Sequence, residues 1–328
     1  MNMKKYILPF LCALLAGGLT TGCSDSANAV SEGELVTVNI IPGLQTSISP
    51  ASGADAVTRA TQPLTPGMEN GIRNIWIVQY GPDGVIYPEI TKYYDISSAG
   101  LLEIPGGLPV QLRTASNTTV CLITNVGEDI ADFIDNWIPD NLNNFNRSKI
   151  KMDIHSLSNE PGGSDGKVGQ LNNVFMFGHY QGAITNETTN ISAILGRLGV
   201  RINVVVTNNT GTNLSGVKIS LKRIPLRMYL SPLKVETLAN EDYTDYYEYI
   251  SALGNGVTAE RFYYIGEDYM PDESNITTLE FTHGGTARSV SIRLGGDPSV
   301  PDEIRDYTLL RNSNYTYNIE LRDISEQP

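Results

Sequence analysis

The sequence predicts an all-β protein with two tandem β-sandwich domains, transthyretin-like with Greek-key connections, and one short helix in the first domain. Short segments with alternating apolar residues recur along the chain, and clusters of Gly, Pro, Asn and Ser separate them. Only one segment has the periodicity of a helix. The chain has 328 residues, more than one hydrophobic core usually serves, so two domains are expected.

The first 22 residues have the pattern of a bacterial lipoprotein export signal. Lys4 and Lys5 precede an almost wholly apolar stretch at 7–19, which is too short to span a bilayer because a membrane helix needs about 20 residues. The sequence Leu-Thr-Thr-Gly-Cys at 19–23 then resembles a lipobox. We therefore expect residues 1–22 to be removed and Cys23 to carry a covalent lipid. An ordinary secretory signal with an incidental cysteine is the alternative, and either signal exports the protein.

The charge of the chain argues against nucleic acid as a partner. Its formal net charge is −13, and this becomes −15 once Lys4 and Lys5 leave with the signal. Such a surface repels phosphate backbones and anionic lipid heads. Cys121 lies in an apolar run and is interpreted as a small core residue rather than a reactive thiol.

The first predicted strand follows a small, polar tether at 24–31. Residues 34–41 alternate, with Val36, Val38 and Ile40 on one face, as a half-buried strand requires. A loose stretch at 42–67 follows, and its single basic residue is Arg59. Further strands of the first domain, expected over 60–190, are predicted at 72–80, 85–87, 101–104, 110–113, 118–125 and 173–180.

The short helix is predicted between these strands. Ile130, Phe133, Ile134 and Trp137 fall at i, i+3, i+4 and i+7, which would place them on one helix face before Pro139. We expect this face to pack on a sheet.

The second domain is expected over 191–328, because 186–190 is polar and a long strand pair begins after it. Its strands are predicted at 191–207, 217–221, 227–229, 261–265, 277–283, 289–294 and 315–321. Gly284-Gly285 has the composition of a hairpin turn.

Nothing in the sequence indicates catalysis, so we expect no enzyme activity. His155, His179 and His283 are scattered, without the spacing of metal ligands or of a nucleophile and its base. No nucleophile elbow, phosphate loop or dinucleotide fingerprint is present. We expect neither a metal nor any cofactor other than the lipid.

Two clusters leave alternatives open. Acidic residues that could bind Ca²⁺ match no calcium-loop spacing and equally suit solvated loops; they are Asp165, Glu267, Asp268, Asp272 and Glu273. Four tyrosines could stack on sugars or a protein partner, or could pack as an amphipathic edge on their own sheet; they are Tyr243, Tyr246, Tyr247 and Tyr249.

Four segments, taken in order, resemble one known family. The segment 309–319, Leu-Leu-Arg-Asn-Ser-Asn-Tyr-Thr-Tyr-Asn-Ile, is similar to the closing motif of the fimbrillin-like lipoproteins of Bacteroidetes, the subunits of type V pili. Residues 72–80 resemble the first long strand after that family's processing loop, and 195–204 resemble the strand that enters its second domain. The segment 262–267 resembles a Tyr-x-x-Glu strand end.

The resemblance implies roles for particular residues. Cys23 matches the lipidated cysteine that carries the precursor to the outer membrane, and Arg59-Ala60 resembles a site cut by an Arg-specific surface protease. Residues 23–59 would then be a propeptide, whose Val36, Val38 and Ile40 fill a groove until cleavage. A sandwich that lacks one strand exposes unpaired backbone groups and apolar pockets, which a strand from another subunit can fill. We expect the released strand to form a detachable edge of its sheet. Arg59 as one basic residue in a surface loop is the alternative.

The function implied is a structural and adhesive subunit of a cell-surface pilus, or fimbrium. Its partners would be other pilus subunits and a glycan or protein on a host or bacterial surface. Only Arg322–Pro328 follow the last predicted strand and offer a single apolar side chain, a poor donor strand, which favours a tip or accessory subunit. The alternative function is a surface lipoprotein, anchored in the outer membrane, that binds glycans.

Overall fold

The computed structural model describes residues 33–45, 71–96, 107–135, 137–151, 155–157, 174–232, 236–269, 271, 273–283, 289–296 and 300–322. Cys23, Arg59 and Ala60, and with them the lipidation and cleavage predictions, lie outside the described residues. So do the strand predicted at 101–104 and the turn predicted at Gly284-Gly285. No helix in the described part of the chain has the length and hydropathy to cross a bilayer.

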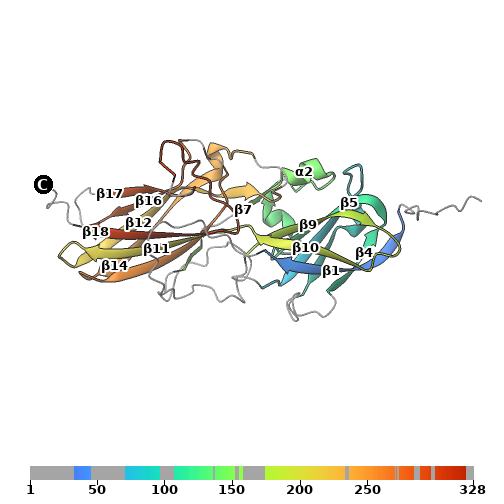
Figure 1. Cartoon of the computed structure of the whole chain (residues 1–328), viewed down its shortest axis with the longest axis horizontal. Helices are drawn as coiled ribbons and strands as arrows, with labels where there is room; N and C mark the ends of the chain where they lie inside the picture. Colours follow the sequence, from blue (N-terminus) through green and yellow to red (C-terminus); the bar gives the residue numbers. More distant parts are fainter. Residues whose placement is uncertain are drawn as a thin grey trace, which may run out of the picture.

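The chain folds into two β-structures that lie end to end along one axis (Figure 1). The first contains a seven-stranded sheet in the order β3-β2-β5-β9-β10-β1-β4. Its strands are β1 (Leu35–Leu44), β2 (Asn74–Tyr80), β3 (Lys92–Asp95), β4 (Leu108–Arg113), β5 (Ala115–Thr124), β9 (Met176–Ile184) and β10 (Asn190–Arg197). A short 3₁₀ turn, η1 (Pro88–Ile90), precedes β3.

The seven-stranded sheet curls around its own hydrophobic core. Gln79 of β2 is fully buried, and its side-chain amide bonds the backbone of Arg113 at the end of β4. Gln79 Nε2 donates to the Arg113 carbonyl at 2.8 Å, and the Arg113 N–H donates to Gln79 Oε1 at 2.8 Å. These bonds join the two arms of the sheet, so apolar residues of β1, β2, β4, β5, β9 and β10 enclose one cluster.

The helix predicted over 130–137 is wrong. This segment forms a 3₁₀ turn, η3 (Ile130–Asp132), and then β6 (Ile134–Asp135), in which Ile134 pairs with Ile150 of β7 (Lys149–Lys151). The apolar residues do pack on one cluster as expected, but pairing with β7 overrides the local helical pattern. The short helix of this domain is α2 (Leu142–Asn146), capped by the side chain of Asn141.

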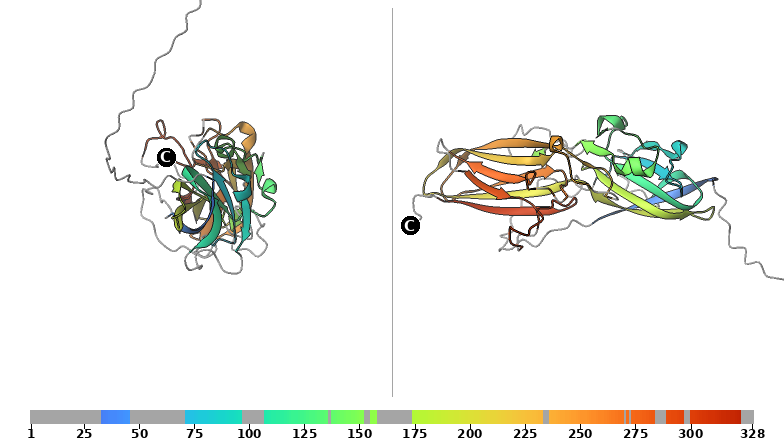
Figure 2. Two further views of the ribbon diagram at one scale, coloured as in Figure 1. Left: turned by 90° about the vertical axis from the view of Figure 1, so that its right-hand side faces the viewer. Right: turned by 90° about the horizontal axis from the view of Figure 1, so that it is seen from above.

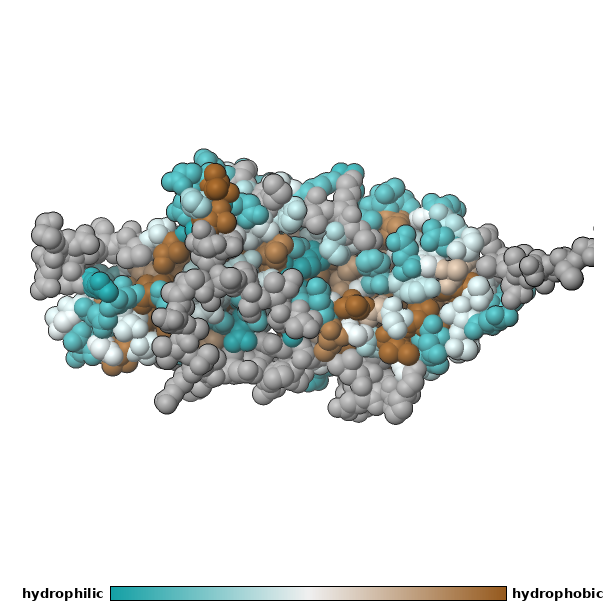
Figure 3. Space-filling model, viewed as in Figure 1, coloured by the Kyte–Doolittle hydropathy of each residue, from teal (hydrophilic) through white to brown (hydrophobic). Residues whose placement is uncertain are grey.

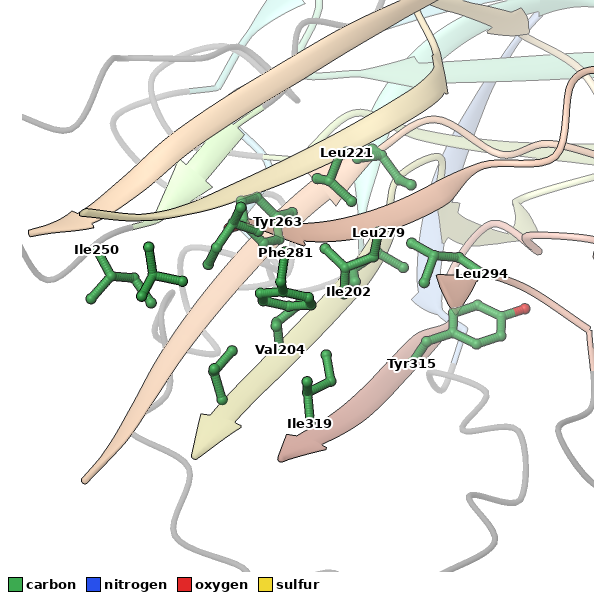
Figure 4. Close-up of a cluster of buried hydrophobic side chains, with 14 of the residues drawn as sticks. Ile202, Val204, Leu221, Ile250, Tyr263, Leu279, Phe281, Leu294, Tyr315 and Ile319 are labelled. Carbon is green, nitrogen blue, oxygen red and sulfur yellow. The ribbon is translucent and has the colours of Figure 1, made fainter. Parts of the chain in front are cut away.

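The second domain is a sandwich of two four-stranded sheets, ordered β18-β11-β15-β8 and β14-β12-β16-β17. The strands are β8 (His155–Leu157), β11 (Val200–Asn209), β12 (Leu214–Pro225), β14 (Tyr243–Leu253), β15 (Thr258–Ile265), β16 (Thr278–Thr282), β17 (Ser289–Arg293) and β18 (Asn314–Arg322). A 3₁₀ turn, η5 (Asn240–Asp242), precedes β14. Figure 4 shows how side chains from both sheets meet between them, with Ile202 and Val204 of β11 facing Phe281 of β16. This confirms the predicted all-β fold of tandem sandwiches.

Sheet membership changes at Leu198-Gly199, and the domain boundary expected near residue 190 stays a prediction. The strand predicted at 191–207 is in fact two strands, because β10 pairs with β1 and β9 whereas β11 pairs with β15 and β18. The polar stretch at 186–190 is only the turn that precedes β10.

Each half of the chain also contributes a strand to the other half. β8 pairs with β15, and β13 (Arg227–Tyr229) pairs with β7. A shared hydrophobic cluster contains Phe175 from the first half and Tyr264 from the second. The two domains are therefore connected by pairing and packing as well as by the covalent chain, and their strands run close to the long axis (Figure 2).

Candidate assembly site at strand β1

The strand that carries Val36, Val38 and Ile40 lies inside its sheet, not at the edge. Residues Leu35–Ile40 of β1 pair antiparallel with β4, and Asn39–Leu44 pair parallel with β10. The expectation of a detachable edge strand was therefore wrong, since β4 is the edge. The reason is that alternation reports which face of a strand is buried and carries no information on how many flanks are paired.

The inner face of β1 is part of the core of the first domain. Val38 and Ile40 are fully buried, and Val36 and Leu44 pack partly against the same cluster. Burial of each such side chain contributes roughly 1.5–3 kcal/mol. The strand is therefore held by its core face as well as by the two flanks.

The outer face of β1 and β10 carries two exposed isoleucines among polar residues. Ile41 of β1 is 41% exposed and Ile194 of β10 is 66% exposed. Figure 3 shows apolar surface over β1 and β10 on this side of the molecule. The sheet thus has apolar residues on both faces at these two strands.

Two prolines show which flanks of β1 and β4 are free. The N–H groups of Asn39 and Gln45 point to β10, with bonds to the carbonyls of Thr189 and Leu195 at 2.9 Å each. Backbone N–H groups alternate between the two flanks of a strand, so the nitrogen of Pro42 faces the β4 side. Pairing with β4 ends at Ile40, so this proline removes no ladder hydrogen bond. Pro109 stands in β4, where a proline suits an edge strand.

The two ends of β1 are anchored differently. At its start, the Gly33 N–H donates to the Thr114 carbonyl at 3.0 Å, and the Thr114 N–H donates to the Glu34 carbonyl at 2.8 Å. At its end, the Gln45 carbonyl accepts a long bond, 3.5 Å, from Nδ2 of Asn312 in the second domain. The segment that contains Arg59 thus leaves the described fold at the domain junction.

Asn312 and Arg311 of the closing motif organise that junction. Asn312 has φ +59; its N–H donates to the Gly199 carbonyl at 3.0 Å, and its Oδ1 accepts from Arg197 Nη1 at 3.1 Å. Arg311 Nε donates to Glu267 Oε2 at 2.6 Å. The sequence indicates only the family resemblance of this motif, because the partners that give it a structural role lie far away in sequence.

Arg311 also links the domains through the backbone. Its Nη1 and Nη2 donate to the carbonyls of Leu230 and Tyr229 at 3.1 and 2.9 Å. Tyr229 ends β13, the strand that pairs with β7 of the first half. This single guanidinium therefore connects the closing motif to the strand shared between the halves.

The other candidate residues have structural roles where they are described. Glu267 pairs with Arg311, and Asp268 accepts a bond from Tyr243 Oη at 3.0 Å; Asp165 and Asp272 lie outside the described residues. Within the described ranges, no three His, Cys, Asp or Glu side chains are grouped as metal ligands. Cys121 is fully buried, and this burial raises the pKa of its thiol. Burial likewise lowers the pKa of His179.

The four tyrosines at 243–249 fall into two groups, one packed and one exposed. β14 is an edge strand, with Tyr243 buried and Tyr246 stacked edge-on against Tyr263 of β15. Tyr247 and Tyr249 instead point outward, each more than half exposed, and Lys218 lies over the Tyr247 ring at 4.4 Å. Two of the four tyrosines therefore pack inside the domain, Tyr246 across to the opposite sheet, and two form an exposed aromatic pair.

Comparison with known proteins places the fold. No protein-family model and no curated protein sequence matches the chain. Among solved structures, a candidate cell adhesion protein from Parabacteroides distasonis aligns with a TM-score of 0.56 at 13% identity, over 90% of each chain. One from Bacteroides eggerthii aligns at 0.55 and 13% identity, over 90% of this chain and 88% of that one. The tip fimbrial protein Mfa3 from Porphyromonas gingivalis scores 0.48 at 13% identity, over 88% and 94%. The first two scores confirm, at the level of the fold, the resemblance to Bacteroidetes surface proteins.

Proposed function

We propose that this chain is a structural and adhesive subunit of a cell-surface pilus, lipidated at Cys23 and assembled by strand exchange after cleavage between Arg59 and Ala60. The observation that carries the proposal is the placement of β1. It completes the first sheet between β4 and β10, yet it connects to β2 only through the segment that contains Arg59. The fold shared with candidate adhesion proteins supports the same reading. A tip or accessory position remains a prediction.

Cleavage would change the thermodynamics of β1 without changing its contacts. While the segment is intact, β1 is tethered and its effective concentration at the slot is high. After cleavage the strand is held only by its two flanks and its core face. An incoming strand from another subunit could then compete for the same slot on equal terms.

The internal position of β1 sets the mode of exchange. Spontaneous loss would leave unpaired N–H and C=O groups on both β4 and β10 and would open the cluster beneath Val38 and Ile40 to water, which is costly. Exchange therefore requires that the incoming strand replaces β1 stepwise, starting where only one flank is paired. Residues Leu35–Val38 pair with β4 alone and Ile41–Leu44 pair with β10 alone, so either end of β1 offers an entry point.

The incoming strand must meet defined requirements. It needs about ten residues in extended conformation, with apolar side chains at alternate positions to replace those of β1. In return the incoming strand gains backbone hydrogen bonds on two flanks, whereas a groove at a sheet edge provides hydrogen bonds on only one flank. A subunit joined in this way would resist mild denaturants.

Intact-mass measurement tests the proposal directly. Protein extracted from the cell surface is incubated with an Arg-specific protease, weighed, and separated by size in mild denaturant. The proposal expects acylated Cys23 before cleavage, an N-terminus at Ala60 afterwards, and oligomers that persist in denaturant; an Arg59→Ala variant should remain intact and monomeric. Protein that keeps Cys23 joined to the rest and stays monomeric under every condition would refute it.

A second candidate function rests on the exposed aromatic pair. Tyr247 and Tyr249 stand edge to face, 6.0 Å apart, on the outer side of β14, a geometry that could stack on a sugar ring. This favours a glycan-binding lipoprotein anchored in the outer membrane. Binding of the monomer to neutral oligosaccharides, lost in Tyr247→Ala but kept in Arg59→Ala, would support it over the pilus.

A further inference from the structure

The second domain contains a polar pocket at the end of its β12-β16-β17 layer. The pocket has a volume of about 620 Å³, within the range of roughly 300–1,000 Å³ that small-molecule sites occupy. Arg223 comes from β12, Thr278 from β16, and Ser291 and Arg293 from β17, while Arg305 comes from the loop before β18. Side chains from three strands and a loop therefore converge on one space.

Tyr307 orients two of the arginines. Its ring is buried, and the guanidinium carbons of Arg293 and Arg305 each lie 5.5 Å from the ring centroid. Stacking on an aromatic face fixes the plane of a guanidinium and leaves its N–H edges free to bind. The pocket thus has preorganised donors.

The three arginines differ in how far their charges are neutralised. Arg305 pairs with Asp302 at 3.2 Å and donates to the Val300 carbonyl, so it shapes the loop. Arg223 stacks on Tyr243 at 4.8 Å and donates to Asn240 Oδ1, and its charge also acts on the nearby Asp245 carboxylate. Arg293 pairs with no carboxylate among the described residues. Arg293 and Arg223 are therefore the groups that can meet a ligand anion.

The charge of this pocket contrasts with that of the whole chain. The protein has 36 acidic and 23 basic residues, yet three arginines line this one space, against Glu273 and Asp302. Arg305 is paired with Asp302, so Arg223 and Arg293 face Glu273 and the lining keeps an excess of positive charge, which favours an anionic ligand. Arginine forks also match the two oxygens of a carboxylate or a sulfate.

We infer that this pocket binds an acidic saccharide through its carboxylate or sulfate group. Arg293 and Arg223 hold the anion. The hydroxyls of Ser291 and Thr278 bond ring hydroxyls, and Ile276, which also lines the space, contacts the apolar face of the sugar. This goes beyond the pilus role, because it assigns a ligand class to a site that takes no part in strand exchange.

Calorimetric titration of the intact chain tests the inference. The probes are glucuronic acid and N-acetylneuraminic acid for carboxylates, N-acetylglucosamine 6-sulfate for sulfates, glucose and N-acetylglucosamine as neutral sugars, and inorganic sulfate as a free anion. We expect an acidic sugar to bind more tightly than both its neutral analogue and inorganic sulfate. The carboxylate and sulfate arms identify which anion is preferred. Equal binding of neutral sugars, equal binding of free sulfate, or no binding at all would overturn the inference.

A matched pair of variants locates the site. Arg293→Gln should weaken the acidic sugar by about ten- to a hundred-fold, because a charge-assisted contact is lost. Arg293→Lys keeps the charge without the fork and should lose less. Arg322→Gln makes the same change at an exposed arginine at the end of β18 and should leave affinity unchanged. Equal effects of Arg293→Gln and Arg322→Gln would show that only overall charge matters, which contradicts a site here.

These measurements use the uncleaved monomer. Failure to bind would therefore leave the assembly proposal standing, and failure to assemble would leave the pocket intact. An unchanged melting temperature of each variant shows that its fold is retained.

Discussion

Among the described strands, two parallel pairs join segments remote in sequence, β1 with β10 and β18 with β11, and β1 and β18 lie in opposite settings. β1 pairs with β10 and is flanked on its other side by β4, whereas β18 pairs with β11 and lies at the edge of its sheet. The strand predicted to be detachable is thus the better enclosed of the two. Under the proposed mechanism, release of β1 would depend on cleavage of its covalent connection at Arg59 and not on an edge position.

Removal of β1 should have the largest effect. A chain that begins at Ala60 lacks ten paired residues and the core contribution of Val38 and Ile40, so we expect the first domain to lose its cooperative unfolding transition. Calorimetry of this chain against the chain that begins at Cys23 measures the loss. Addition of a synthetic peptide of residues 33–45 should restore the transition. A truncated chain that melts like the longer one would show that β1 is dispensable.

Truncation of one core residue of β1 should lower the free energy of unfolding by a smaller but measurable amount. Ile40→Ala removes a fully buried side chain and should lower the free energy of unfolding by about 2–5 kcal/mol. Denaturant titration measures it. The neighbouring Ile41→Ala is the matched control, because Ile41 faces outward, and its expected cost is under about 1 kcal/mol. Equal costs would place β1 in another register.

Loss of the Gln79 hydrogen bonds that close the first sheet should have the next largest effect on stability. Gln79→Met keeps the volume of the side chain but leaves the Arg113 N–H and carbonyl without their partner, at a cost of roughly 1–3 kcal/mol. Gln111→Met, on the exposed side of β4, removes an amide bonded to Thr37 Oγ1 and should be nearly neutral. Comparable destabilisation by both variants would argue that the sheet is not closed through Gln79.

The smallest effect should come from pH at β18. Burial raises the pKa of Tyr317 to about 12, against about 10 in an unfolded chain. The unfolded state therefore ionises first, so the stability from this group is complete below pH 10 and is lost as pH rises towards 12. Tyr317→Phe should flatten the alkaline part of the stability profile. A profile identical to that of the parent chain would exclude Tyr317 as its source. β1 contains no ionisable side chain, so its own side chains contribute no pH dependence to the stability.

The local sequence pattern predicted most of the strands, because the alternation of apolar and polar residues involves only neighbouring positions. The run at 72–80 became β2, and the alternating tyrosines at 315 and 317 became β18. The helix at 130–137 failed because the same apolar spacing also suits a 3₁₀ turn followed by β6, and pairing with Ile150 decides between them.

The candidate site was predicted only in part. Val36, Val38 and Ile40 do share the core face of one strand, as their spacing required. Their enclosure between β4 and β10 depends on partners that no local pattern identifies, with Asn39 opposite Asn190. The junction of Arg311 with Glu267 was missed for the same reason, and so was the pocket at Arg293.

The direction of the strands gives the enclosed position of β1 a mechanical consequence. The strands lie close to the long axis of the molecule (Figures 1 and 2), and ladder hydrogen bonds are perpendicular to their strands. Tension along a fibre built from such rods would load both ladders of an inserted strand in shear, so that many bonds must rupture together. An edge strand pulled sideways would instead unzip bond by bond. In the proposed fibre, pairing on two flanks would therefore make the joint between subunits slow to form and hard to pull apart.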